Sequence, residues 1–249
     1  MANKKVIVTL SNYGYWGEEL VGPLEAMEEA GYEVTFATQT GQKPTVLSVS
    51  ADAEWIDPTL GHTVTTPEMA AKVQKLDASE RLSHPIKIDD IKPDDYDAVF
   101  LVGGSGTLLD MNNNWHLQDV IRKFYQEDKP IGAICYGVGA LAYTRAPESY
   151  KSIIFGKRVT GHPRRFDWRA GTGFANTDAV TPGPPYPLEF VLRDAVGPDG
   201  EFMGDHPVEE ISVVTDYPFV TGRSTMDSTE TGRQFVAAIE GSKAKVGSK

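Results

Sequence analysis

Short apolar strand patterns alternate with helical patterns along most of this chain. A β-branched run at 5–10 is followed by a helical pattern at 18–30 and a second strand pattern at 34–37, which together form a βαβ unit. The later patterns are strands at 97–102, 130–135, 158–161, 211–215 and 219–221, and helices at 114–127, 188–195 and 228–240. This alternation predicts an α/β fold, a single doubly wound domain with a mostly parallel sheet and helices on both faces.

Residues 41–93 interrupt the alternation. Five prolines break the pattern there, and only 66–76 has helical character, with Thr66 as the N-cap and Pro67 at the first helical position. We therefore expect one domain at 1–240 that carries an inserted cap segment at about 41–93. The Gly/Ser/Lys-rich segment 241–249 is predicted to be a flexible tail.

The charge and cysteine content exclude several kinds of partner and site. The 249 residues include 24 Lys and Arg against 35 Asp and Glu, a net charge of −11 with no basic block, so no nucleic-acid or anionic-membrane surface is expected. The longest apolar stretch, 131–143, is too short to span a bilayer, and no apolar leader follows the start, which predicts a cytoplasmic protein. A single cysteine excludes an internal disulfide and a cysteine-rich metal site. No metal and no cofactor are predicted.

That cysteine lies in the segment with the most specific pattern. Residues 131–140 read Ile-Gly-Ala-Ile-Cys-Tyr-Gly-Val-Gly-Ala, a strand that ends on Cys135 and turns directly into a helix start of small residues. Such a nucleophile elbow exposes the side chain at the turn, and the helix N-terminus behind it is expected to lower the pKa of the thiol. The alternative is that Cys135 is a small buried hydrophobic residue.

With these residues the chain resembles the ThiJ/PfpI family, within its branch of heat-shock chaperones and glyoxalase III enzymes. The resemblance extends over about 5–240 and rests on the elbow and on the segments at 18–23, 41–44, 55–60, 96–106 and 221–224. It implies a flavodoxin-like fold of the class I glutamine-amidotransferase type. It also implies a homodimer.

The resemblance implies a set of site residues. Its elbow cysteine corresponds to Cys135 and its companion acid to Glu19, while the backbone N–H groups of Gly104 and Tyr136 would bind an oxyanion. The alternative for Glu19 is a solvated helix acid, a role that the adjacent Glu18 can fill while Glu19 faces inward. The alternative for the glycine pair at 103–104 is a simple tight turn.

Tyr136 departs from the family pattern, because many enzymes of this branch have histidine directly after the elbow cysteine. A tyrosine ordinarily cannot act as a base at neutral pH. Among the five histidines, His162 is the best replacement because it follows the strand at 158–161, and Asp167 is a weaker candidate for an orienting acid. Glutaminase activity is disfavoured because the stretch 222–225 lacks the required His-x-Glu pair.

Three arginines, Arg164, Arg165 and Arg169, lie close together in this acidic chain. They could clamp a carboxylate substrate or form a dimer surface, but a solvated loop paired to local acids is the default interpretation.

Three functional hypotheses remain open from the sequence. The first is an enzyme, a lyase or hydratase of the glyoxalase III type, that acts on small reactive carbonyls and converts methylglyoxal to lactate through Cys135. The second is a non-enzymatic holding chaperone or a redox sensor whose thiol is oxidised. The third is a hydratase or C–N hydrolase of the amidase type, with its specificity altered by Tyr136. In the enzymatic cases the partner is a small carbonyl or amide-like molecule.

Overall fold

The computed structural model describes residues 3–169, 173–174 and 187–246. Most of the predicted loop at 164–187, and the last residues of the predicted tail, lie outside the described residues.

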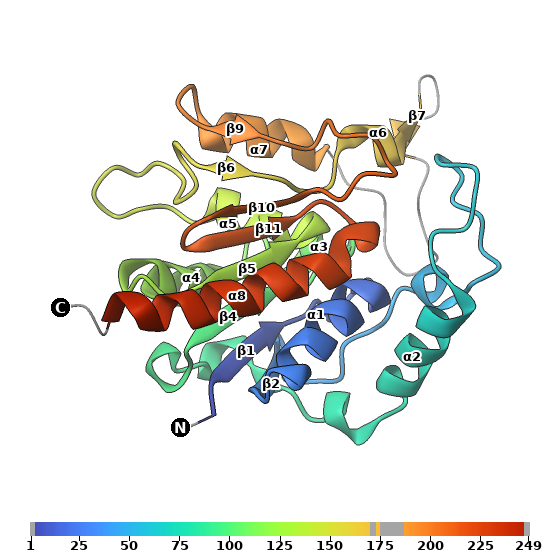
Figure 1. The fold of residues 1–249 in the computed structure, drawn as a ribbon, viewed down its shortest axis with the longest axis horizontal. Helices are drawn as coiled ribbons and strands as arrows, with labels where there is room; N and C mark the ends of the chain where they lie inside the picture. The colour runs from blue at the N-terminus through green and yellow to red at the C-terminus, as the bar shows by residue number, and fades with distance from the viewer. Residues whose placement is uncertain (1–2, 170–172, 175–186, 247–249) are drawn as a thin grey trace.

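A seven-stranded, mostly parallel sheet forms the centre of the protein, and six of its strands correspond to predicted strand patterns, whereas β3 was not predicted (Figure 1). The strand order is β10-β11-β5-β4-β1-β2-β3, and every pair is parallel except β10 with β11. Its strands are β1 (Lys5–Thr9), β2 (Glu33–Thr38), β3 (Ile86–Lys87), β4 (Ala98–Leu101), β5 (Ile131–Ile134), β10 (Val213–Asp216) and β11 (Phe219–Gly222). The fully buried sequences of β4, β5 and β11 are typical of strands covered on both faces.

Helices cover both faces of the sheet. On one face α1 (Gly17–Glu29) packs along α8 (Ser228–Val246), and Figure 1 shows the two side by side in front of the strands. On the other, α4 (Trp115–Gln126) packs against β4, β5 and α5 (Gly139–Tyr143). The buried residues of α4 recur at helical spacing, at Leu117, Val120, Ile121 and Phe124. The predicted flavodoxin-like α/β fold is therefore confirmed.

The segment at 41–93 contains short elements and one longer helix. The longer helix is α2 (Pro67–Asp77), and the Thr66 side chain accepts a hydrogen bond from the Met69 backbone N–H, as the capping prediction requires. The short elements are η1 (Ser48–Ala51), η2 (Glu80–Leu82), η3 (Ile88–Asp90) and η4 (Pro93–Asp95). β3 adds an edge strand beside β2, so the segment returns to the central sheet before β4.

A second group of small elements lies above the sheet in Figure 1. The predicted strand at 158–161 is shorter than expected, because β6 (Arg158–Val159) pairs only with β9 (Glu201–Phe202) and stays outside the central sheet. The other elements of this group are α6 (Arg164–Asp167), α7 (Leu188–Val196), and the pair β7 (Trp168–Arg169) and β8 (Gly173–Phe174). The short helix α3 (Thr107–Asp110) instead follows β4.

The closing helix is longer than the sequence pattern indicates. It was predicted to end at residue 240, but α8 continues to Val246 and takes up most of the predicted tail. Gly241 does not end the helix, and the Lys and Ala that follow it have high helix propensity.

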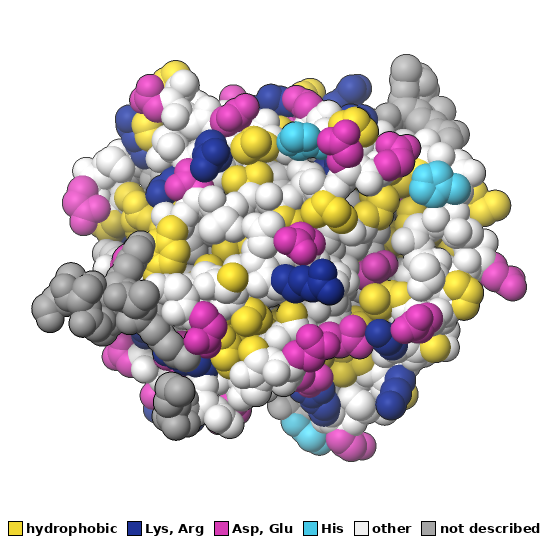
Figure 2. Space-filling view, viewed as in Figure 1, with side chains coloured by type: hydrophobic (Ala, Val, Ile, Leu, Met, Phe, Trp, Pro, Cys, Tyr) yellow, Lys and Arg dark blue, Asp and Glu magenta, His cyan; other side chains and the backbone are white. Residues whose placement is uncertain are grey.

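The face shown in Figure 2 carries Lys and Arg side chains scattered among Asp and Glu side chains rather than gathered in one basic patch. In the described part of the chain, no helix has the length and hydrophobicity needed to cross a bilayer.

Candidate active site

A pocket lies where the carboxyl ends of β4, β5 and β11 meet the first turn of α1. This is the edge at which doubly wound sheets usually bind their ligands. The pocket has about 600 Å³ of empty space, including space open to solvent. Residues from all four elements line it, with Gly104 after β4, Cys135 after β5, Ser224 after β11 and Glu19 from α1.

Cys135 occupies a strained backbone position at the end of β5. Its φ is +55°, in the left-handed region that residues other than glycine seldom adopt, and its side chain faces the pocket. The chain then forms a 3₁₀ turn, η5 (Cys135–Val138), before α5 begins. The sharp turn at Cys135 has the geometry of a nucleophile elbow.

Glu19 lies beside this thiol. The Trp16 backbone N–H donates to the Gly103 carbonyl at 3.1 Å, which fixes the start of α1 against the end of β4. The Glu19 side chain, only 1% exposed, shares a hydrogen bond with Cys135, while its Oε2 atom has no hydrogen-bond partner. Glu19 is therefore a buried site residue and not a solvated helix acid.

Burial sets the protonation of this pair. It raises the pKa of the Glu19 carboxyl well above its usual range, although the hydrogen bond with Cys135 opposes the shift. Burial also raises the pKa of the Cys135 thiol, and the neighbouring carboxyl groups of Glu19 and Asp167 add to the effect. The expectation that the elbow lowers the thiol pKa is wrong, because desolvation outweighs the weak dipole of a five-residue helix. The thiol therefore needs a base to take its proton.

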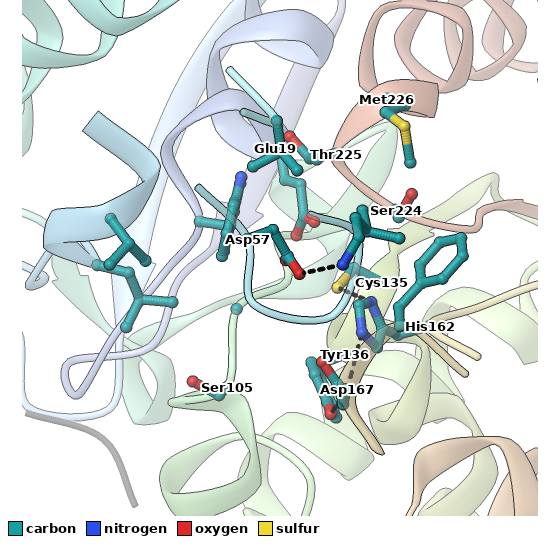
Figure 3. Close-up of a pocket in the computed structure, with 17 residues that line it drawn as sticks. Glu19, Asp57, Ser105, Cys135, Tyr136, His162, Asp167, Ser224, Thr225 and Met226 are labelled. Carbon is teal, nitrogen blue, oxygen red and sulfur yellow. Dashed lines mark hydrogen bonds and ion pairs between the residues drawn. The ribbon is translucent and has the colours of Figure 1, made fainter. Parts of the chain in front are cut away.

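The structure places His162 next to the sulfur. Its Nδ1 atom is 3.2 Å from Cys135 Sγ, and its Nε2 atom is 2.8 Å from Asp167 Oδ2, an ion-pair distance at which the N–H is not aligned for a hydrogen bond. Figure 3 shows the imidazole between the sulfur and the carboxylate. His162 and Asp167, the histidine and the orienting acid considered from the sequence, thus form a Cys-His-Asp arrangement with Cys135.

A short stretch of chain positions both of these residues. The Thr160 backbone N–H donates to Thr221 Oγ1 at 3.0 Å, which ties the segment after β6 to β11. His162 follows at once, and the single turn of α6 brings Asp167 back toward it. The Phe166 ring meets the imidazole edge-on, with centroids 5.7 Å apart.

Tyr136 supports the imidazole from the other side. Its ring stacks on His162 at 4.8 Å between centroids, and its hydroxyl donates a hydrogen bond to Asp167 Oδ2. Burial, followed by the charge of Asp167, raises the pKa of Tyr136 well above its usual range, so the hydroxyl keeps its proton. The backbone N–H of Tyr136 also donates to the Cys135 sulfur.

The glycine pair at 103–104 allows the close approach of these groups. Gly104 has φ +107°, and a Cβ there would lie 2.6 Å from the Gly14 carbonyl oxygen. A Cβ on Gly103 would press against Glu19 Oε2 and lie 2.7 Å from the Cys135 Cβ. The absence of a side chain at Gly103 is therefore what lets acid and thiol meet.

We expect Gly103→Ala to destabilise the protein by about 1–3 kcal/mol and to lower activity, because the new methyl group must displace Glu19 or Cys135. Chemical denaturation measures the loss. The control is Gly241→Ala, where a Cβ meets open space. Equal stability of both variants, with unchanged activity at Gly103→Ala, would show that the two side chains are not packed this tightly.

Glu18 differs from its expected role as a solvated acid. It is partly buried, and its Oε2 atom accepts hydrogen bonds from Thr225 Oγ1 at 2.9 Å and from Thr65 Oγ1 at 3.4 Å. Burial raises the pKa of Glu18 to about 6, although both hydrogen bonds oppose the shift. Glu18 thereby links the segment at 41–93 to the rim of the pocket.

The raised pKa of Glu18 predicts a pH-dependent stability. A carboxyl whose pKa is higher in the folded state stabilises the fold when protonated, and this contribution is lost as the pH rises through about 6. The loss is about 2 kcal/mol, since one pKa unit corresponds to about 1.4 kcal/mol. Glu18→Gln removes the titration but keeps an acceptor oxygen. Its free energy of unfolding, relative to the native chain, should rise by that amount between about pH 4 and about pH 8. A difference in the free energy of unfolding between Glu18→Gln and the native chain that stays constant across this pH range would contradict the interpretation. The exposed Glu29, changed to Gln, is the control.

Arg164 and Arg165 do not form a clamp in the pocket. Arg164 and Arg165 are exposed, and the Arg165 guanidinium donates to backbone carbonyls at 204–206 rather than to acidic side chains. The side chain of Arg169 lies outside the described residues. The buried guanidinium of this region belongs to Arg223, which binds Asp227 and the carbonyls of 206–210.

Sequence reasoning missed most of the pocket wall. The apolar lining residues gave no signal of their own, because they read as ordinary core. Asp57 is also part of the wall, and its Oδ1 accepts from the backbone N–H groups of Thr59 and Leu60 at 2.7 and 2.9 Å. The sequence feature that could have identified Asp57 is the Asp-Pro-Thr turn within the family-like segment at 55–60. Among the described residues, no group of three or more His, Cys, Asp or Glu side chains is arranged to hold a metal ion.

Comparison with known proteins agrees with the family resemblance and with the fold. A family model described as ThiJ/PfpI family-like matches residues 10–158. Glyoxalase 3 of Candida albicans is 24% identical over 95% of this chain and 98% of its own length. The glutathione-independent glyoxalase HSP31 of Saccharomyces cerevisiae is 25% identical over 65% of this chain and 69% of its own.

A solved structure supports the same fold. The crystal structure of glyoxalase III from Candida albicans superposes on this one with a TM-score of 0.71, covering 94% of this chain and 97% of that chain. The identity over this superposition is 21%, so the likeness shows the shared fold.

Proposed function

The chain belongs to the ThiJ/PfpI-like family, and on this basis we propose that it is a glutathione-independent, cysteine-dependent enzyme that converts small 2-oxoaldehydes to 2-hydroxycarboxylates. Methylglyoxal would give lactate. The names of the similar proteins support this reaction class. The feature of the site that most supports this proposal is the 3.2 Å contact between Cys135 Sγ and His162 Nδ1, with Asp167 at the other ring nitrogen.

In the first step His162 takes the thiol proton while the Cys135 sulfur attacks the aldehyde carbon. A carbon–sulfur bond forms, and the aldehyde oxygen receives the proton to complete a hemithioacetal. Because the thiol pKa is raised by burial, attack depends on this general base rather than on a preformed thiolate. The backbone N–H groups of Gly104 and Tyr136 stabilise the oxygen as its charge develops.

In the second step a proton moves from the former aldehyde carbon to the neighbouring carbon. The free imidazole removes it, while the protonated Glu19 carboxyl donates to the neighbouring carbonyl oxygen. The imidazolium returns its proton to the neighbouring carbon while the hydroxyl on the sulfur-bearing carbon gives its proton back to Glu19, which turns the adduct into a thioester of the hydroxy acid with no atom gained or lost. Water, activated by His162, then breaks the carbon–sulfur bond and restores the thiol.

The test is lactate formation by the purified chain from methylglyoxal in the absence of glutathione and added metal. We expect lactate in proportion to the methylglyoxal consumed. Consumption without lactate would indicate simple thiol adduction, and no consumption would reject the proposal. A reaction that requires glutathione would also reject it.

A second candidate activity is hydrolysis of an amide or thioester. The Cys135, His162 and Asp167 arrangement favours it, because these three groups suffice for attack on an acyl carbon and for hydrolysis of the resulting thioester. Ammonia release from apolar carboxamides, with no turnover of methylglyoxal, would favour this candidate over the first.

A further inference from the structure

The pocket around Cys135 has mostly apolar walls that come from both the segment at 41–93 and the main body. Its seven large apolar lining residues, apart from Tyr136, are Trp16, Leu47, Val49, Leu60, Val64, Phe166 and Met226. The reactive groups lie together on one side, as Figure 3 shows for Cys135 and His162. An aldehyde held at the sulfur would therefore direct its substituent toward apolar side chains.

The apolar wall of the pocket is more extensive than methylglyoxal needs. Its apolar side chains come from the start of α1, from the segment at 41–93, from α6 and from the turn after β11, more than a single methyl group can contact. A methyl substituent would leave most of the apolar wall in contact with water. An aromatic or branched substituent would cover it.

The charged groups at the pocket are acidic. Glu19, Asp57 and Asp167 line it, whereas none of the described lining residues is Lys or Arg. Burial raises the pKa of the Glu19 carboxyl well above its usual range. A bound anion would meet this acidic lining with no Lys or Arg among the described lining residues to offset it.

The buried guanidinium nearest to the pocket does not change this balance. Arg223 lies behind the Phe166 ring, with its Cζ atom 5.5 Å from the ring centroid. Its Nε atom is 3.2 Å from Asp227 Oδ2, and its other donors bind backbone carbonyls. Its charge is thus paired within the core, and Phe166 separates it from the ligand space.

We propose that this site takes neutral 2-oxoaldehydes that carry an aromatic or bulky apolar substituent, and that it rejects substrates with a negative charge on that substituent. This inference rests on the proposed function. It also accounts for product release, because the reaction turns a neutral substrate into a carboxylate within a pocket whose described lining residues include no Lys or Arg to hold it.

The experiment compares kcat/KM for methylglyoxal, phenylglyoxal and 4-carboxyphenylglyoxal. We expect phenylglyoxal to exceed methylglyoxal by about tenfold or more, as buried apolar groups usually allow. The carboxylated analogue should fall about tenfold or more below phenylglyoxal, because like charges disfavour its binding. Equal values for all three would overturn the inference and leave the proposed function intact. No turnover of any of them would reject both.

Two variants test the wall and the charge separately. Val64→Phe fills part of the apolar space and should reduce the preference for phenylglyoxal over methylglyoxal by about tenfold. Met226→Lys places a cation at the half-buried rim and should raise the ratio of 4-carboxyphenylglyoxal to phenylglyoxal turnover by about tenfold, whereas Met226→Gln, the matched neutral control, should not. Ratios that stay unchanged in both Val64→Phe and Met226→Lys would overturn the assignment of specificity to this pocket.

Discussion

The Cys135→Ala variant is expected to form no measurable lactate from methylglyoxal, a loss of about 10⁴-fold or more in kcat. The reaction as proposed passes through two intermediates bound to this sulfur, so nothing replaces it. The chain has no second cysteine that could take over the role. The measurement is the rate of lactate formation by the native chain and by Cys135→Ala, at equal protein concentrations and without glutathione.

The folded state of this variant needs a separate check, because Cys135 is buried at 3% exposure. The thermal midpoint should fall only slightly, since the change removes one atom from a site that already borders a pocket. Retention of a tenth or more of the native rate by a folded Cys135→Ala would contradict nucleophilic catalysis and would leave Glu19 as the acting group.

Replacing His162 with alanine should lower kcat by about a thousandfold, within the usual range for a general base. His162 is the only described histidine in contact with the sulfur, and the adjacent Tyr136 holds its proton too firmly to act as a base. Added imidazole should restore part of the rate, because the substitution opens space between the Tyr136 and Phe166 rings. Steady-state kinetics with and without imidazole measures both effects.

His116→Ala is the matched control for this experiment. His116 is an exposed residue of α4 whose Nε2 atom is 3.6 Å from Asp89, well outside the pocket. Its substitution should leave kcat within about twofold, as surface changes away from a site usually do. If both histidine variants keep the native rate, the Cys-His-Asp arrangement has no catalytic role.

The sequence predicted most of the fold because local patterns and global packing agree in it. Short apolar and β-branched patterns marked β1, β2, β4, β5 and β11, and the capping signal at Thr66 located the start of α2 correctly. The errors were at β3, which was not predicted, at β6 and at the end of α8. The length and pairing of β6 depend on which distant strand is available, and the end of α8 depends on weak helix propensities. Neither is set by a strong local signal.

The candidate site was only partly predictable. The elbow could be named from its local pattern, and Glu19 from the resemblance to the ThiJ/PfpI family. The contact between Cys135 and His162 could not be derived, because it depends on how the segment after β6 folds back over β5. The direction of the thiol pKa was predicted wrongly because burial is a tertiary property that no local pattern reports. The homodimer and the cytoplasmic location stay predictions.

The most direct measurement of the central claim is the rate of alkylation of Cys135 by iodoacetamide as a function of pH. The chain contains one cysteine, so the intact-protein mass reports this thiol alone. The account predicts that at pH 7 the native chain reacts about a hundredfold faster than His162→Gln, and that the gap narrows as rising pH ionises the thiol directly. Identical rate profiles for the two proteins across the whole pH range would contradict the claim that His162 activates Cys135.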